Sequence, residues 1–164
     1  MSSNQTITDE DEALWKRYVE TYNNYLSAGN EFNAKVSNKV AVLKNALRSG
    51  DSKLAIKVAE LLEAEDLKQL FEELLGAASY SHGGTGTAQK LILSLPREWL
   101  LTNIEVYAEP FISSGDYEVY WALLTLYSKL DRDLTQRLAQ RAVNQENIDI
   151  REAGEAFLTT DNSN

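Results

Sequence analysis

Residues 113–131 read "SSGDYEVYWALLTLYSKLD", and this stretch indicates the fold class. Its apolar residues recur at helical spacing, with Val119, Leu123 and Leu126 on one face of the expected helix. The Ser-Gly-Asp turn ahead of it supplies Asp116 as an N-cap. Helical spacing recurs along nearly the whole chain, and no stretch alternates with the period of two that is typical of strands. We therefore predict an all-α protein.

A second Ser-Gly-Asp turn opens "SGDSKLAIKVAELLEAED", and its Asp51 lies 65 residues before Asp116. This distance is close to two periods of about 33 residues, a length typical of helix-pair repeats. One period after each aspartate stand Gly84 and Asp149, and each begins a helical pattern. The spacing predicts about nine helices, with an N-terminal capping helix and antiparallel pairs stacked as a short α-solenoid. The pairs cover residues 32–64, 66–95, 97–130 and 132–158.

The N-terminal helix is expected to begin after the N-cap Thr8 and to end at Gly29. Since a terminal helix pair otherwise exposes its core, we expect this helix to cap the first pair. It could instead mediate self-association through its apolar side chains, Trp15, Tyr18, Tyr22, Tyr25 and Leu26. We expect a single domain over residues 8–158, between a flexible N-terminus (residues 1–7) and a disordered tail (residues 159–164).

Two segments resemble known helical-repeat families. Residues 149–158, "DIREAGEAFL", are similar to the second helix of a HEAT repeat, and Pro110 stands where HEAT repeats commonly kink. Residues 108–131 resemble the middle of a tetratricopeptide repeat, with matches at Ala108, Phe111, Gly115, Asp116 and Tyr117. They depart from that family's small residues and closing proline at Tyr120, Tyr127 and Arg132. Both resemblances imply a solenoid of antiparallel helix pairs that acts as a non-enzymatic binding scaffold.

The composition favours a protein as the partner. The 164 residues include 43% apolar residues, enough to bury a core, and carry a formal charge of −9, which disfavours nucleic acid and anionic membranes. The absence of cysteine excludes thiolate metal sites, and a single histidine leaves little for metal binding or histidine-based catalysis. With no signal peptide or membrane-spanning run in the sequence, we predict a cytoplasmic protein without catalytic residues, cofactor or metal.

A partner-binding face is predicted around Trp121. On its helix, Trp121 lies among polar residues opposite the apolar face, and the matching position 65 residues earlier is Ile56. Tryptophan is enriched at binding hot spots, and second helices usually line one side of a solenoid. The predicted face comprises Trp121, Ile56, Lys53, Lys57, Gln89, Glu118 and Thr125. The alternative is that Trp121 and Ile56 contact helices of adjoining pairs.

The stretch "SYSHGGTGTAQKLIL", residues 79–93, offers a competing function. Its only histidine and its glycines could form a loop that binds a small anion or supports an enzyme: His82, Gly83, Gly84 and Gly86. A phosphate loop normally needs a preceding strand or a lysine at set spacing, and Lys90 comes too late. We therefore favour a turn between helix pairs.

Basic residues concentrate in residues 34–58, where six of them stand against one acidic residue. The six are Lys35, Lys39, Lys44, Arg48, Lys53 and Lys57. They flank the apolar stripe of the helix expected there, so their stems can cover apolar surface while their charges stay in water. This pattern favours a solvated rim over a nucleic-acid site.

Overall fold

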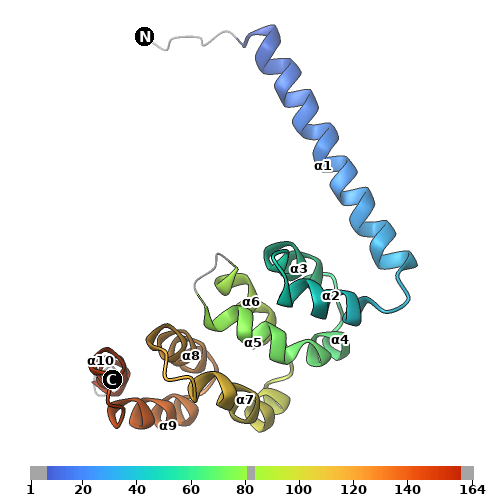
Figure 1. The fold of residues 1–164 in the computed structure, drawn as a ribbon. Helices are drawn as coiled ribbons and strands as arrows, with labels where there is room; N and C mark the ends of the chain where they lie inside the picture. Colours follow the sequence, from blue (N-terminus) through green and yellow to red (C-terminus); the bar gives the residue numbers. More distant parts are fainter. Residues whose placement is uncertain (1–6, 81–83, 160–164) are drawn as a thin grey trace, which may run out of the picture. The chain divides into compact units, whose positions relative to one another are not determined.

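The computed structural model describes residues 7–80 and 84–159, and these ranges contain ten helices and no strand (Figure 1). The all-α prediction is confirmed, with one helix more than expected. The helices are α1 (Asp9–Lys35), α2 (Lys39–Arg48), α3 (Ser52–Ala59), α4 (Ala64–Gln69), α5 (Phe71–Ser79), α6 (Thr85–Leu93), α7 (Arg97–Ile112), α8 (Tyr117–Leu130), α9 (Arg132–Val143) and α10 (Ile148–Thr159). None of the described helices is long and apolar enough to span a lipid bilayer.

The chain divides into two compact units, and the first, residues 1–39, contains the long helix α1. Thr8 is its N-cap, as predicted, because its hydroxyl accepts a hydrogen bond from the Asp11 N–H (3.1 Å) and its own N–H donates to the Asp11 carboxylate (2.9 Å). The predicted helix end at Gly29 is wrong. Glycine inside a helix costs only about 1 kcal/mol relative to alanine, so α1 continues to Lys35, before the extended backbone of Val36.

The second unit, residues 40–164, begins inside the single domain that we expected over residues 8–158. The difference arises because residues 32–35, expected to open the first helix pair, continue α1, which contains no buried residue. The capping role of this helix therefore stays a prediction. The expected flexible N-terminus and disordered tail fall almost entirely on residues 1–6 and 160–164, outside the described part of the chain.

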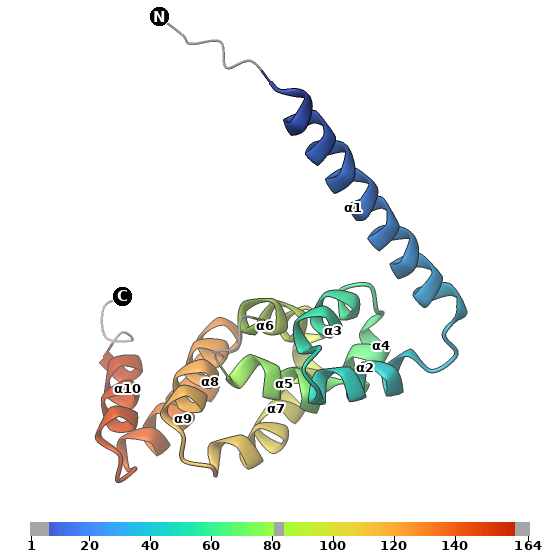
Figure 2. The same ribbon diagram turned by 45° about the horizontal axis from the view of Figure 1, so that its top comes forward.

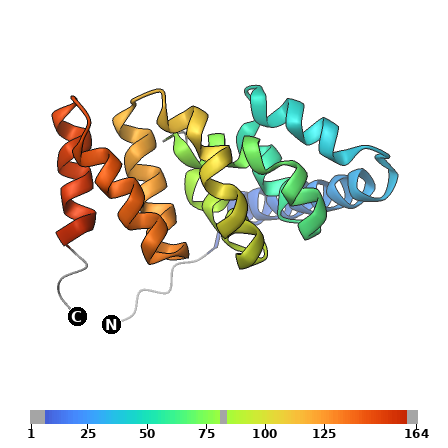
Figure 3. The same ribbon diagram turned by 90° about the horizontal axis from the view of Figure 1, so that it is seen from below.

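The helix pairs of the second unit follow one another in chain order, from α2 and α3 at one end to α9 and α10 at the other (Figures 2 and 3). The expected pairs correspond to α2 with α3, α5 with α6, α7 with α8, and α9 with α10. Successive pairs pack together, since α3 contacts α6, α5 contacts α7 and α8, and α8 contacts α9 and α10. Each helix of an inner pair is therefore covered on more than one side.

The core of this unit is formed by apolar stripes on its helices. The stripe over α4 and α5 is buried at Leu67, Leu70, Phe71, Leu74 and Ala78, and the stripe of α9 at Leu134, Leu138 and Ala142. In α8, Tyr120 and Tyr127 are buried with Val119, Leu123, Leu124 and Leu126. The Phe71 ring makes edge contacts to Trp99 (4.9 Å between centroids) and Tyr107 (5.3 Å). These contacts join α5 to the start and middle of α7.

The aspartates expected as caps form side-chain cap bonds at some helices and not at others. Before α8 the prediction is confirmed: the Asp116 carboxylate accepts a hydrogen bond from the Glu118 N–H (2.8 Å), and Gly115 has φ +68°, which glycine favours. Asp51 stands at the N-cap of α3 but makes no side-chain cap bond. At α10 the cap is Asn147, which accepts from the Asp149 N–H (2.9 Å).

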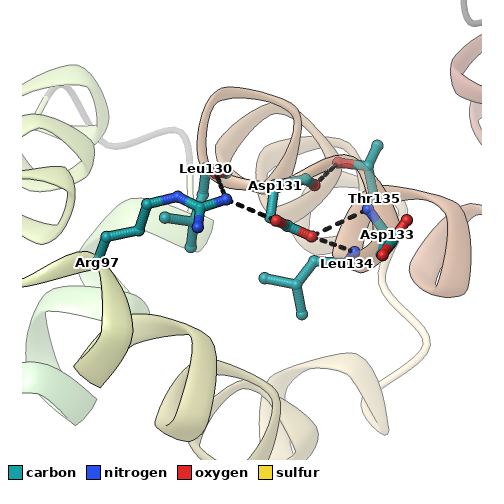
Figure 4. A network of polar contacts seen from close by, with 6 residues as sticks. All are labelled: Arg97, Leu130, Asp131, Asp133, Leu134 and Thr135. Carbon is teal, nitrogen blue, oxygen red and sulfur yellow. Dashed lines mark hydrogen bonds and ion pairs between the residues drawn. The ribbon is translucent and has the colours of Figure 1, made fainter.

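Asp131 ties three helices together at the junction of the last two pairs (Figure 4). Its N–H donates to Tyr127 O (2.8 Å) at the end of α8, and its carboxylate accepts from the Asp133 and Leu134 N–H groups at the start of α9. Arg97 of α7 donates to the other carboxylate oxygen (2.7 Å) and to Leu130 O (3.3 Å). The Leu134 N–H, with Asp133 and Arg97, holds the pKa of this carboxyl below its ordinary value.

Contacts between residues about one predicted period apart recur in this unit. Gln89 donates to Ala122 O, and Arg137 and Arg141 of α9 pair with Glu105 and Glu109 of α7, at separations of 32 or 33 residues. Both arginines bind both oxygens of their carboxylate. Polar contacts thus join neighbouring pairs, between residues separated by about the spacing of the predicted turns.

Candidate functional site

A groove of about 400 Å³ lies between the α5–α6 pair and α8. Its lining combines aromatic rings with hydroxyl, amide and carboxylate groups: Ser79, Tyr80, Thr85, Gln89, Tyr117, Glu118, Trp121, Ala122 and Thr125. We call this the α6–α8 groove. It is larger than a second groove that it meets at Trp121.

The wall on α8 follows directly from helical spacing. Tyr117, Trp121 and Thr125 stand four residues apart, so they share one face of the helix, opposite the buried Val119 and Leu123. The Asp116 cap fixes where this face begins, and the Thr125 hydroxyl donates to Trp121 O (2.8 Å). Residues of the core therefore hold this face outward.

Gln89 forms part of the other wall and holds the two walls together. Its side-chain amide donates to Ala122 O (3.3 Å), and its carbonyl oxygen accepts from the Lys129 ammonium (3.1 Å). Only 6% of Gln89 is exposed. Its main role is therefore to join α6 to α8, although it was predicted as part of the binding surface.

Trp121 forms a ridge between the α6–α8 groove and the second groove, which has a volume of about 310 Å³. The second groove, between α8 and α10, is lined by Tyr117, Trp121, Asp149, Glu152 and Ala153. The Trp121 indole is supported by the edge of Phe157 (5.6 Å between centroids) and by Tyr117 (6.3 Å). It nevertheless remains 44% exposed. A large, supported aromatic side chain thus stays accessible from both grooves.

The charged residues that line the two grooves are acidic, while the Lys129 ammonium is held beside the α6–α8 groove by Gln89 (3.1 Å). Glu118 lines one groove, Asp149 and Glu152 line the other, and none of the lysines or arginines that the structure describes lines either. Aromatic faces attract cations, and carboxylates around them add to that attraction. The surface is therefore suited to a cationic group that carries an apolar stem.

Four residues of the predicted face line the α6–α8 groove: Trp121, Gln89, Glu118 and Thr125. The other three lie on α3. Lys53 and Lys57 are exposed, with Lys57 paired to Glu60 (3.0 Å), and neither lines a groove with Trp121. Ile56 is 2% exposed, so its assignment to an exposed face is wrong.

The burial of Ile56 has a simple cause in the next pair. A methyl group at Gly84, the N-cap of α6, would stand 2.6 Å from the Ile56 Cδ1 atom, so the start of α6 lies directly on this side chain. Trp121 likewise meets the next pair, since Asp149 at the start of α10 lines the second groove with it and Phe157 of α10 contacts its ring. Both side chains thus meet the adjoining pair, as the alternative interpretation expected, but the larger indole extends beyond the contact.

The glycine-rich loop is only partly within the described residues. His82 and Gly83 lie outside them, so a ligand loop or enzyme built on His82 stays a prediction. Gly84 serves helix packing, as described, and Gly86 lies within α6, where an added Cβ would meet no atom within 4 Å. In the part of the chain that the structure describes, no three His, Cys, Asp or Glu side chains are grouped to hold a metal ion.

Three of the six basic residues singled out between positions 34 and 58 are engaged in ion pairs. Lys35 pairs with Glu31, Arg48 with the buried Glu73, and Lys57 with Glu60. Pairing with nearby carboxylates reduces the positive potential that phosphate groups would meet. The ion pairs agree with a solvated rim.

Sequence reasoning missed several residues of the site. Tyr117 could have been found, because it stands one helical turn before Trp121. Tyr80, Ser79 and Phe157 had no such signal, since their place beside Trp121 depends on how separate helices pack.

No known protein family, curated protein or solved structure matches the chain.

Proposed function

We propose that this protein is a non-enzymatic interaction module that binds a basic segment of another protein across the Trp121 ridge. The observation that carries the proposal is the ridge itself: an indole 44% exposed, supported by Phe157 and Tyr117, between two grooves whose charged residues are acidic. A lysine or arginine can lay its stem on the indole while its charge faces the carboxylates.

Trp121 and the acidic residues of the grooves should contribute different amounts to the binding free energy, because a bound segment would bury them to different extents. Trp121 can become fully desolvated under a bound segment, and buried tryptophans at interfaces commonly contribute at least about 2 kcal/mol. Glu118, Asp149 and Glu152 are exposed at the rim, where each charge contributes less and is screened by salt. The tryptophan should therefore set affinity, and the carboxylates should set the preference for basic partners.

Peptide display on the intact chain tests the proposal directly. Random peptides are selected on wild type and counter-selected on Trp121→Ala, with Val106→Ala as the control because Val106 is exposed on α7 outside both grooves. We expect selected peptides to carry lysine or arginine beside an apolar residue. They should bind Trp121→Ala at least about 30-fold more weakly than wild type, and bind Val106→Ala equally.

Charge variants test the chemistry of the partner. Glu118→Gln combined with Glu152→Gln should weaken the selected peptides and reduce the dependence of their affinity on salt. A large drop in the melting temperature of Trp121→Ala, or selected peptides without basic residues, would contradict the proposal. In the first case Trp121 would be part of the core, and in the second the acidic rim would have no role.

A further inference from the structure

Helix α1 carries an aromatic stripe that it does not bury itself. Trp15, Tyr18, Tyr22 and Tyr25 are 47 to 64% exposed, and Trp15 stacks on Tyr18 of the same helix (5.8 Å, 20° between planes). Val19 and Leu26, also exposed, flank the stripe. A continuous apolar face of this size on one helix is typical of an interaction surface.

The spacing of the stripe is that of a coiled coil. Its residues alternate three and four apart, at positions 15, 18, 22, 25, 29 and 32. This average of 3.5 residues keeps a seam facing a partner helix along its whole length. The 27 residues of α1 give a helix of about 40 Å, long enough for three such heptads.

We propose that α1 pairs with α1 of a second copy of this chain, in antiparallel orientation. The charges of the helix decide the direction. Its first turn contains Asp9, Glu10, Asp11 and Glu12, and its last turn contains Lys35. A parallel pair would bring two first turns of four carboxylates together. An antiparallel pair keeps the two acidic first turns at opposite ends, each beside the last turn of the other copy, which contains Lys35 and no acidic residue.

The antiparallel register is also complementary in shape. When Tyr22 of one copy faces Tyr25 of the other, Trp15 faces Phe32 and Tyr18 faces Gly29. Each large ring then meets a ring or the open space above a glycine, where no other atom lies within 4 Å. The same register places Val19 beside Leu26 of the second copy, so both flanking apolar residues are covered.

A lipid surface fits this helix less well than a second copy does. Interfacial helices usually carry lysine and arginine on their polar face, which attracts anionic lipids. Here the first turn is acidic, and the only basic residue in the last turn, Lys35, is paired with Glu31 (2.6 Å). The self-complementary register and charges favour pairing with another α1.

Sedimentation equilibrium of the full chain tests the self-association. We expect wild type to have twice the monomer mass of 18.4 kDa at micromolar concentration. Tyr22→Glu places two charges in the centre of the seam, and we expect it to weaken dimerisation at least 100-fold. Ser27→Glu, on the opposite face of the same helix, is the matched control and should remain dimeric. Circular dichroism checks that both variants keep their helices.

Cross-linking tests the orientation, and the absence of native cysteine makes it clean. Trp15→Cys and Phe32→Cys chains are prepared separately, mixed under reducing conditions and then oxidised. In the antiparallel register the mixture forms a disulfide between unlike chains. In a dimer of two Trp15→Cys chains, the two introduced cysteines then lie roughly 25 Å apart along the helices, too far to form a disulfide.

Each other outcome overturns the proposal. Disulfide dimers formed by Trp15→Cys alone or Phe32→Cys alone would show a parallel pair. A wild-type monomer, or a dimer that Tyr22→Glu leaves intact, would show that the stripe is not the seam. These readouts do not involve the Trp121 ridge, so they are independent of the proposed function.

Discussion

Helices α1 and α8 each carry one tryptophan and three tyrosines, and they use them in opposite ways. In α8 two of the tyrosines are fully buried, whereas all four of the corresponding side chains of α1 are exposed. The difference lies in the residues that separate the aromatic rings in each helix. Leucines and a valine fill the spaces between the rings of α8, while mostly Lys, Arg, Glu, Thr and Asn separate those of α1.

Aromatic content alone therefore does not identify a core helix. A ring is buried within one chain when aliphatic neighbours make the helix apolar around most of its circumference, as in α8. A ring on a narrow stripe with polar residues on the remaining surface is suited to a single partner helix. Four pairs of variants, each with one member in α1 and one in the second unit, test this contrast.

Removing a ring from each helix should give the largest contrast. Tyr120→Ala leaves a cavity in the core of the second unit and is expected to lower its free energy of unfolding by about 3–5 kcal/mol. Tyr18→Ala removes an exposed ring and should change that free energy by less than about 0.5 kcal/mol. Hydrogen exchange at core amides of the second unit measures both. A comparable loss from Tyr18→Ala would mean that α1 stabilises this core.

Adding a methyl group to a glycine in each region should give opposite signs. Gly154 of α10 lies against α9, where a new Cβ would stand 2.7 Å from Ala139 O and 2.9 Å from Val143 N. Since backbone atoms cannot yield easily, Gly154→Ala should cost about 1–3 kcal/mol.

At Gly29 of α1 nothing lies within 4 Å, and alanine is the better helix former, so Gly29→Ala should stabilise α1 locally by about 0.5–1 kcal/mol. Thermal unfolding reports the first change, and hydrogen exchange near residue 29 reports the second. An unchanged melting temperature for Gly154→Ala would show that α9 and α10 are less closely packed than described.

The hydroxyl groups of the tyrosines offer a smaller contrast. The Tyr127 hydroxyl is buried and has no hydrogen-bond partner among the described residues, and burial raises its pKa. Tyr127→Phe removes an unsatisfied polar group and should stabilise the second unit by about 1 kcal/mol. Tyr25→Phe, at an exposed hydroxyl of α1, should have no measurable effect. Denaturant titration measures the free energy of unfolding of both variants. A lower value for Tyr127→Phe than for wild type would refute the expectation.

Ion pairs should give the smallest contrast, and one that depends on pH. Hydrogen bonds from Arg141, with a further one from Ser113, lower the pKa of Glu109 from its ordinary 4.5 to about 2. Because the folded pKa is depressed, this stabilisation is present above pH 4.5 and is lost as the pH falls toward 2. Both partners are about half exposed, so the effect should stay below about 1 kcal/mol.

Glu109→Gln should therefore destabilise the second unit at neutral pH and reduce its loss of stability between pH 4.5 and 2. Glu31→Gln, which breaks an exposed pair within α1, is the control and should leave the second unit unchanged. Unfolding curves across this pH range measure both. Parallel acid profiles for wild type and Glu109→Gln would contradict the assignment.

Local signals were sufficient for much of the fold. The apolar face of α8, the caps Thr8 and Asp116, and the positions of the turns depend on neighbours within a few residues, and the structure has them where they were expected. The helix end predicted at Gly29 was wrong because a glycine ends a helix only where the following residues leave the helical conformation, and here they remain helical.

The site was harder to predict than the fold. Spacing on one helix correctly put Glu118, Trp121 and Thr125 on one face, because that depends on α8 alone. The burial of Ile56 depends on Gly84, which belongs to another helix pair, and the tie made by Gln89 depends on the backbone of Ala122. Such contacts are set by the distance between helices, which no single-helix pattern contains.

The contacts of Asp131 limit insertions and deletions between α8 and α9. One residue ends α8 through its N–H and begins α9 through its carboxylate. An insertion on either side would separate these two tasks and would also move the carboxylate away from Arg97. Insertions are generally tolerated at exposed turns whose backbone groups make few bonds. The backbone and side chain of Asp131 make several bonds at this junction. The chain between α8 and α9 should therefore tolerate only one residue.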